Sequence, residues 1–196
     1  NSGTQLPILN LNHINVRNED GVAYLQTMSP VDCIFLDPAR RNEHGGKTVS
    51  IADCEPNVAE LEDLLLSKAS RTMIKLSPML DLSLALKELK HTQEVHILSV
   101  NNECKELLIL LGQTSPAEIT IHCVNLFTKG TQEEQHFVFT REQEQRSQCT
   151  YTDSLGDYLY EPNASLLKAG AFRSIAAAYP SGNCIPTVIF IPPILY

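Results

Sequence analysis

The sequence predicts an α/β protein, because short apolar strands alternate with amphipathic helices along most of its 196 residues. Apolar runs rich in β-branched residues lie at 31–36, 72–76 and 94–100 and are too short for amphipathic helices. Between them, apolar residues recur at helical spacing at 58–65 and 82–89. This alternation predicts a mostly parallel sheet with right-handed crossovers.

The remaining elements follow from turn and cap signals. We expect a strand at 14–17 and then a helix through 22–25. Asn57 is expected to cap the helix at 58–65, and Gly112 to end a helix at 103–111 that Asn101-Asn102-Glu103 caps. Two alternating runs, 119–124 and 136–140, predict an antiparallel pair.

The last part of the chain has a different character. Residues 142–148 are charged and predict a linker, and 151–179 predict a separate, mainly helical piece that begins its last helix at the cap Asn163. The expected core of that piece is Leu166, Leu167, Ala171, Phe172, Ile175 and Ala176.

Composition limits the possible functions. The net charge of −8 gives no general basic field for nucleic acid or anionic lipid, although a local basic patch stays possible. Six cysteines are scattered without zinc spacing, which favours reduced thiols and a cytoplasmic location. The six histidines show no useful spacing to a carboxylate or cysteine, so no metal site is expected. No signal peptide or transmembrane span is visible, so no membrane partner is expected.

The strand at 31–36 runs directly into Asp37-Pro38-Ala39-Arg40. Ligands of open α/β sheets bind at the carboxyl ends of the strands, so Asp37 is a candidate site residue that could accept hydrogen bonds from an amine or orient a cofactor. The alternative is a strand end closed by an aspartate turn with nothing bound. Lys75 is expected to pair with Asp37 or Asp53, and a structural pair is as plausible as a catalytic one.

Five motifs together resemble the class I S-adenosylmethionine-dependent methyltransferases that end in a THUMP-like region. They are VDCIFLDPARR, GGKTVSIADCEPN, IKLSPMLDLS, VHILSVNNECKELLILL and LYEPNASLLKAGAFR. The resemblance implies an incomplete Rossmann-like methyltransferase sheet, from its third strand onward, followed by a small α+β or helical C-terminal piece. The family's glycine-rich first loop and its ribose-binding acid have no counterpart in this chain, so we expect a fragment.

The resemblance also implies roles for individual residues. Asp20, with Gly21, stands where the family accepts a hydrogen bond from the adenine amino group. Asp37 and Pro38 stand beside the transferable methyl, and Arg40 would contact the substrate. Amino-nitrogen methyltransferases usually carry a second proline and an aromatic at this tip, and here Ala39 and Arg40 replace them.

Uracil-C5 methyltransferases need a cysteine nucleophile after the following strand. This chain reads Lys75-Leu76-Ser77-Pro78 there, which disfavours that chemistry. The cofactor expected for the full-length protein is S-adenosyl-L-methionine, and the expected function is methyl transfer, with RNA as the substrate. The alternative is a non-catalytic RNA-binding or scaffold protein that retains the fold.

The expected organisation has four parts: the later part of the methyltransferase domain at 1–112, a small β-rich, ferredoxin-like segment at 113–148, the start of a THUMP-like region at 149–179, and a tail at 180–196. An unpaired, apolar edge on the strand at 31–36 is expected to drive self-association.

The tail is expected to be a frameshift product. One nucleotide string encodes Cys184-Ile-Pro-Thr-Val-Ile-Phe-Ile-Pro-Pro193 in one frame and the family-like LHPNSHLYTS in another. The alternative is a genuine apolar edge strand.

Overall fold

The computed structural model describes residues 13–40, 50–130, 133–149, 151 and 160–179. The predicted frameshifted tail, residues 180–196, lies outside this range. The helices are α2 (Gly21–Thr27), the 3-10 helix η1 (Ile51–Asp53), α3 (Val58–Lys68), α4 (Leu82–Glu88), α5 (Arg141–Arg146), α6 (Ala164–Ala169) and α7 (Phe172–Ala178). The strands are β1 (Val31–Leu36), β2 (Ala39–Arg40), β3 (Cys54–Glu55), β4 (Ala69–Leu76), β5 (Thr92–Val100), β6 (Glu103–Gly112), β7 (Thr120–Leu126) and β8 (Gln135–Thr140).

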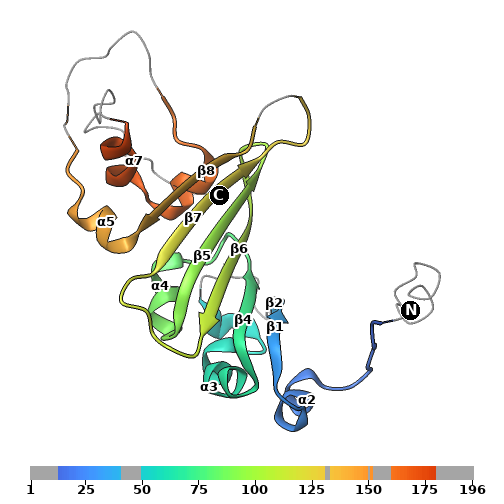
Figure 1. The fold of residues 1–196 in the computed structure, drawn as a ribbon. Helices are drawn as coiled ribbons and strands as arrows, with labels where there is room; N and C mark the ends of the chain where they lie inside the picture. Colours follow the sequence, from blue (N-terminus) through green and yellow to red (C-terminus); the bar gives the residue numbers. More distant parts are fainter. Residues whose placement is uncertain (1–12, 41–49, 131–132, 150, 152–159, 180–196) are drawn as a thin grey trace.

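Six strands form one sheet in the order β1-β4-β6-β5-β7-β8, and β2 and β3 form a small separate ladder (Figure 1). The pairs β1–β4 and β5–β7 are parallel, whereas β4–β6, β5–β6 and β7–β8 are antiparallel. The α/β fold is confirmed, but the sheet is mixed where a mostly parallel one was predicted. The difference arises because β6 returns directly from β5 as a hairpin, with no crossover helix between them.

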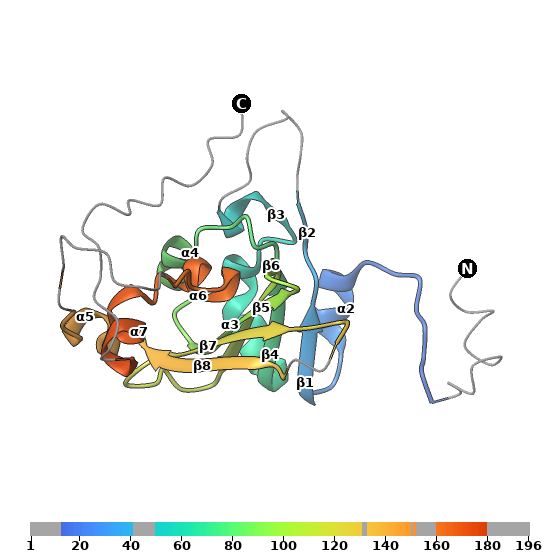
Figure 2. The ribbon, with the colours of Figure 1, turned by 90° about the horizontal axis from the view of Figure 1, so that it is seen from above.

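One face of the sheet carries the core. The helices α3, α4 and α6 pack on this covered face, as Figure 2 shows for α4 and α6 above the strands. The strands contribute alternate side chains to it, such as Ile74, Ile97 and Ile109, which are fully buried. The opposite, open face consists of the intervening residues, which are half-buried or exposed. The strands β7 and β8, which follow residue 112, belong to this same sheet.

Side chains cap the N-termini of the helices at the positions that the sequence predicted. Asn57 accepts a hydrogen bond from the Ala59 amide and Asn163 accepts one from the Leu166 amide, so both predicted caps are confirmed. Asp81 caps α4 in the same way, through the amide of Leu84. Each cap satisfies a backbone donor that has no partner within its helix.

The predicted helix at 103–111 is wrong, because these residues form β6. Asn101 and Asn102 have φ angles of 50° and 62°, so they form a two-residue turn with both residues in the left-handed region. Such a turn joins adjacent antiparallel strands, and it places the apolar run of β6 in the centre of the sheet. The asparagines are therefore a hairpin turn and not a helix cap.

Two further predictions are wrong. The stretch 14–17 is not a strand: it extends away from the sheet in Figures 1 and 2, with Ile14 and Val16 exposed. No strand among the described residues lies beside it to complete a ladder. The charged stretch at 142–148 is not a linker but largely the helix α5, since Thr140 and Gln143 form a reciprocal capping box at its start.

The helix α6 packs on the sheet and α7 packs on α5, so neither helix forms a separate piece. The Ala164 amide donates to Asn102 Oδ1 at 2.8 Å, and Lys168 Nζ donates to the Leu80 carbonyl at 2.6 Å. Leu166 and Ala171 are buried as predicted, whereas Phe172 is 46% exposed and does not belong to the core.

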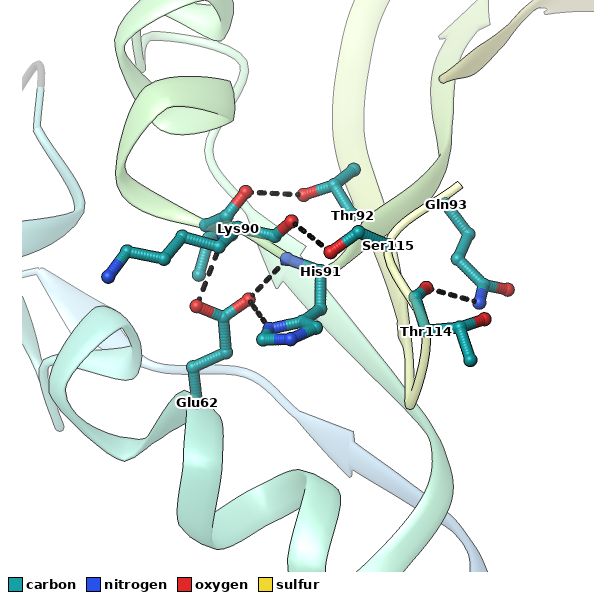
Figure 3. A network of polar contacts seen from close by, with 8 residues as sticks. Glu62, Lys90, His91, Thr92, Gln93, Thr114 and Ser115 are labelled. Atoms are coloured by element: carbon teal, nitrogen blue, oxygen red, sulfur yellow. Dashed lines mark hydrogen bonds and ion pairs between the residues drawn. The ribbon is translucent and has the colours of Figure 1, made fainter. Parts of the chain in front are cut away.

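The carboxylate of Glu62 joins α3 to the turn before β5 (Figure 3). It is 4% exposed and accepts hydrogen bonds from the amides of Lys90 and His91 at 3.1 and 2.7 Å. The His91 ring nitrogen Nδ1 lies 3.3 Å from the same carboxylate. A buried carboxylate with two amide donors is stabilising, so Glu62 fixes the start of the strand.

Candidate functional site

The tips of β1 and β4 lie side by side because the two strands are parallel and in register, with Leu36 opposite Ile74. Asp37 follows Leu36, and Lys75 follows Ile74. Lys75 Nζ lies 2.7 Å from Asp37 Oδ2, so the predicted ion pair forms with Asp37. The structure thereby brings the predicted site residue Asp37 together with a cation from the neighbouring strand.

Lys75 lies between two carboxylates. Its Nζ is also 4.0 Å from Glu106 Oε2, which comes from β6 on the other side of β4. The hydrogen bond to Asp37 raises the pKa of Lys75, the charges of Glu106 and Asp37 raise it further, and partial desolvation opposes them. Lys75 is therefore a fixed cation at neutral pH, suited to orienting a carboxylate and not to accepting a proton.

An open cleft of about 310 Å³ surrounds this pair at the carboxyl edge of β1 and β4. Its walls include Pro38, Ala39, Ser77, Pro78 and Lys105, together with the ion pair itself. The first three residues of the Asp37-Pro38-Ala39-Arg40 motif thus form part of the cleft wall. Arg40 pairs through its backbone with Cys54 in the β2–β3 ladder beside it.

The two predicted adenine-site residues are elsewhere. Asp20 caps α2, where its Oδ1 accepts a hydrogen bond from the Ala23 amide at 2.8 Å, and Gly21 is the first residue of that helix. Asp20 and Gly21 are both exposed, and neither lines the cleft. The structure brings Asp37 and Pro38 together in one cleft but does not bring Asp20 and Gly21 into it.

A second cleft, of about 300 Å³, lies beside α5 and is lined by Glu118, Glu142, Gln143, Arg146 and Ser147. A hydrogen bond between Glu118 and Glu142 lowers the pKa of Glu118 and raises that of Glu142. Arg146 forms an ion pair with Glu142 within α5. These contacts satisfy the carboxylates among themselves at the surface, so this cleft is the weaker candidate.

The histidines contradict the expectation that none meets a carboxylate. His91 contacts Glu62, and His96 Nε2 lies 3.0 Å from Glu94 Oε2. His122 lies beside His96, and partial burial and the neighbouring histidine His96 lower the pKa of His122. The missed signal was Glu94-x-His96 within a strand, since residues two apart on a strand share one face.

Cys33, Cys104, Cys123 and Cys149 are thiols and form no disulfide. Among the described residues, no helix combines the length and the apolar character needed to cross a bilayer.

Comparison with known proteins identifies a similar solved structure. The chain is 38% identical to a putative methyltransferase from Porphyromonas gingivalis W83, with a TM-score of 0.76 over 90% of this chain. The match spans 44% of that protein, so this chain corresponds to less than half of the neighbour's length. Residues 158–182 match the model of a ferredoxin-like domain. No curated protein matches the chain.

Proposed function

We propose that this chain is part of an S-adenosylmethionine-dependent methyltransferase that acts on RNA. The observation that carries the proposal is the cleft at the tips of β1 and β4, where Lys75 holds the carboxylate of Asp37 at 2.7 Å. The similarity to the Porphyromonas gingivalis protein, at 38% identity, supports a methyltransferase function. Parallel-strand tips are the usual ligand sites of open α/β sheets.

The bound cofactor would supply an electrophilic methyl group on a sulfonium. Asp37 and Pro38 would position the accepting group, because both line the cleft and the Asp37 carboxylate, with 55% of its side chain exposed, can accept a further hydrogen bond from a substrate. Lys75 acts through Asp37 as a positioning residue. Arg40, three residues after Asp37, would contact the substrate, and its planar guanidinium suits phosphate binding or base stacking.

Asp20 and Gly21 are assigned to the adenine end of the cofactor by the family resemblance, and they lie outside the cleft at Asp37. Asp20 uses Oδ1 to cap α2, and its Oδ2 makes no hydrogen bond within the described residues. A side chain added at Gly21 would meet nothing within 4 Å, so the space beside this backbone is open. The methionine and ribose ends would need further residues, and the matched protein is more than twice as long as the part that this chain spans.

RNA as the substrate rests on local charge, since the chain as a whole is acidic. Lys75 and Lys105 both line the cleft. Arg40 adds a cationic residue at its edge by sequence position. Lys75 pairs with Asp37 and Lys105 pairs with Glu103, so a phosphate would have to compete with these carboxylates for the two lysines. The net charge of −8 limits non-specific binding elsewhere.

A non-catalytic RNA-binding or scaffold role is the second candidate. The observation in its favour is that Lys75 already occupies Oδ2 of Asp37, as an ion pair that closes a strand end would. A purely structural Asp37 would affect folding when removed and would leave no activity to lose.

The test uses the full-length protein and two matched variants. Asp37→Asn should abolish transfer of a labelled methyl group to total RNA, while affinity for S-adenosylhomocysteine by calorimetry stays within about tenfold. Asp63→Asn, an exposed carboxylate on α3, is the control and should leave both unchanged. Methyl transfer that survives Asp37→Asn would remove Asp37 from the site. Absence of cofactor binding by the full-length protein would favour the scaffold.

A further inference from the structure

A row of imidazoles crosses the open face of the sheet near its centre. Glu94 and His96 lie on β5, two residues apart, and His122 on β7 is the register partner of His96. Glu94 Oε2 lies 3.0 Å from His96 Nε2 and 3.8 Å from His122 Nε2. One ligand atom from each of the three residues lies within 4.8 Å of the others.

The sheet itself creates this convergence. Val95 and Ile97 occupy the covered face with no exposed surface, so the alternate positions Glu94 and His96 must occupy the open face. The parallel register then sets the His122 ring on the His96 ring, with centroids 4.4 Å apart and planes within 4°. The three side chains are thus positioned by the backbones of two central strands and not by a loop.

The donor set has a specific chemistry. Two imidazole nitrogens and one carboxylate oxygen are a ligand set of zinc sites that keep one position for water. Calcium and magnesium prefer oxygen ligands alone, and the cluster contains no thiolate. In a tetrahedral site with bonds of about 2.0–2.1 Å, ligand atoms lie about 3.4 Å apart, so modest side-chain rotations would suffice.

A simple ion pair would use only one of the histidines. Glu94 contacts both, and all three side chains are half-buried, with 41%, 29% and 22% of the side chains of Glu94, His96 and His122 exposed. The ligand atoms of two stacked imidazoles and one carboxylate lie close together, and rotation of the rings out of their stack would turn both nitrogen lone pairs toward one cation. That arrangement favours a cation between them.

We propose that Glu94, His96 and His122 form a binding site for a divalent transition metal, with Zn²⁺ as the best-fitting ion and water as the fourth ligand. None of the three residues lines the Asp37 cleft. The site therefore stands independently of the proposed methyl transfer, and failure of either proposal leaves the other intact.

His136 provides a matched control. Its ring stacks on His122, with centroids 5.7 Å apart, but it does not belong to the cluster of converging ligand atoms. His136→Asn removes an imidazole from the same row without removing a proposed ligand. His122→Asn and Glu94→Gln each remove one ligand while keeping similar shape and polarity.

Calorimetric titration of the chelator-treated full chain with Zn²⁺ is the test. The unmodified chain should bind one ion, His122→Asn should weaken binding about a hundredfold or more, and Glu94→Gln about tenfold or more. His136→Asn should stay within about threefold of the unmodified chain. Failure to bind one equivalent, or equal loss in His122→Asn and His136→Asn, would overturn the site.

Two additional measurements distinguish loss of a metal ligand from misfolding and from binding by thiols. Circular dichroism without metal checks that each variant folds. If His122→Asn does not fold, His96→Asn takes its place in the titration. A Co²⁺ complex should show d–d bands without a thiolate charge-transfer band, as nitrogen and oxygen ligands require. A strong thiolate band would assign the metal to the exposed Cys33 or another cysteine and would overturn the proposal.

Discussion

The two faces of the sheet come from alternate residues of the same strands, yet they differ in burial. On the covered face, Ile74, Ile97 and Ile109 have no exposed surface and pack under α3, α4 and α6. On the open face, the neighbouring residues His96 and Leu108 are only half-buried, and polar groups gather. Because side chains alternate with a period of two, each strand contributes stability through one set of residues and chemistry through the other.

Thiol reactivity should show the largest difference between protected and exposed positions. Cys123 lies on the covered face at 1% exposure, and burial raises its pKa to about 12. At about pH 8 only about one Cys123 in 10⁴ is a thiolate, whereas Cys33 on the edge strand β1 is exposed. In a native alkylation pulse followed by mass spectrometry, Cys33 should react about a thousandfold faster or more. Similar native rates would contradict the burial of Cys123, and equal rates in denaturant are the control.

Truncation of two neighbouring residues on β6, one on each face, should show the difference between the faces as a difference in unfolding free energy. Ile109→Ala opens a cavity on the covered face and should cost about 3–4 kcal/mol of unfolding free energy. Leu110→Ala, on the open face, should cost about 1 kcal/mol. Urea unfolding of both variants checks the difference, and equal losses would show that the open face is also packed in solution.

Removal of the buried carboxylate of Glu62 should measure how much a buried polar group contributes to stability. Glu62→Ala leaves the amides of Lys90 and His91 without their acceptor and should cost about 2–3 kcal/mol. Asp63→Ala, the exposed neighbour on α3, should have almost no effect and serves as the control. Equal urea midpoints for the two variants would show that water replaces the Glu62 contacts.

The exposed ion pair should have the smallest effect. The pKa of Lys75 is raised above the usual 10.5, so its stabilising contribution is complete below that value and disappears as pH rises past the folded value. The small urea-midpoint difference between the unmodified chain and Lys75→Met should stay constant near neutral pH and vanish in strong alkali. A urea-midpoint difference that disappears on acidification but persists in alkali would assign the effect to the carboxylates and not to Lys75.

The sequence predicts strands and helices well where the local residue pattern favours the same element that the sheet requires. The strands at 31–36, 72–76 and 94–100 and the helices at 58–65 and 82–89 are confirmed, with boundaries shifted by a few residues. The failure at 103–111 is instructive, since the run of leucines around Ile109 satisfies helical spacing as well as a buried strand. Only the double asparagine before it distinguishes the two, because Asn tolerates positive φ.

The contact between Asp37 and Lys75 was predictable because both residues lie at strand ends. Asp37 and Lys75 lie at the tips of neighbouring parallel strands, so their pairing follows from the register. The histidine row was not predictable in this way, because its members come from β5, β7 and β8 and meet only through their register. Spacing along the chain does not show that β5 and β7, which β6 separates in the sequence, become neighbours in the sheet.

The β5–β6 hairpin also has a consequence for the order of folding. Its strands are joined by two residues and occupy the centre of the sheet, while β1 and β8 join at opposite ends. Closing this short loop costs little chain entropy, so the hairpin can form before any distant pairing. The sheet would then grow outward in two directions from a local nucleus, and strand β1, at an edge, would dock as one of the last elements.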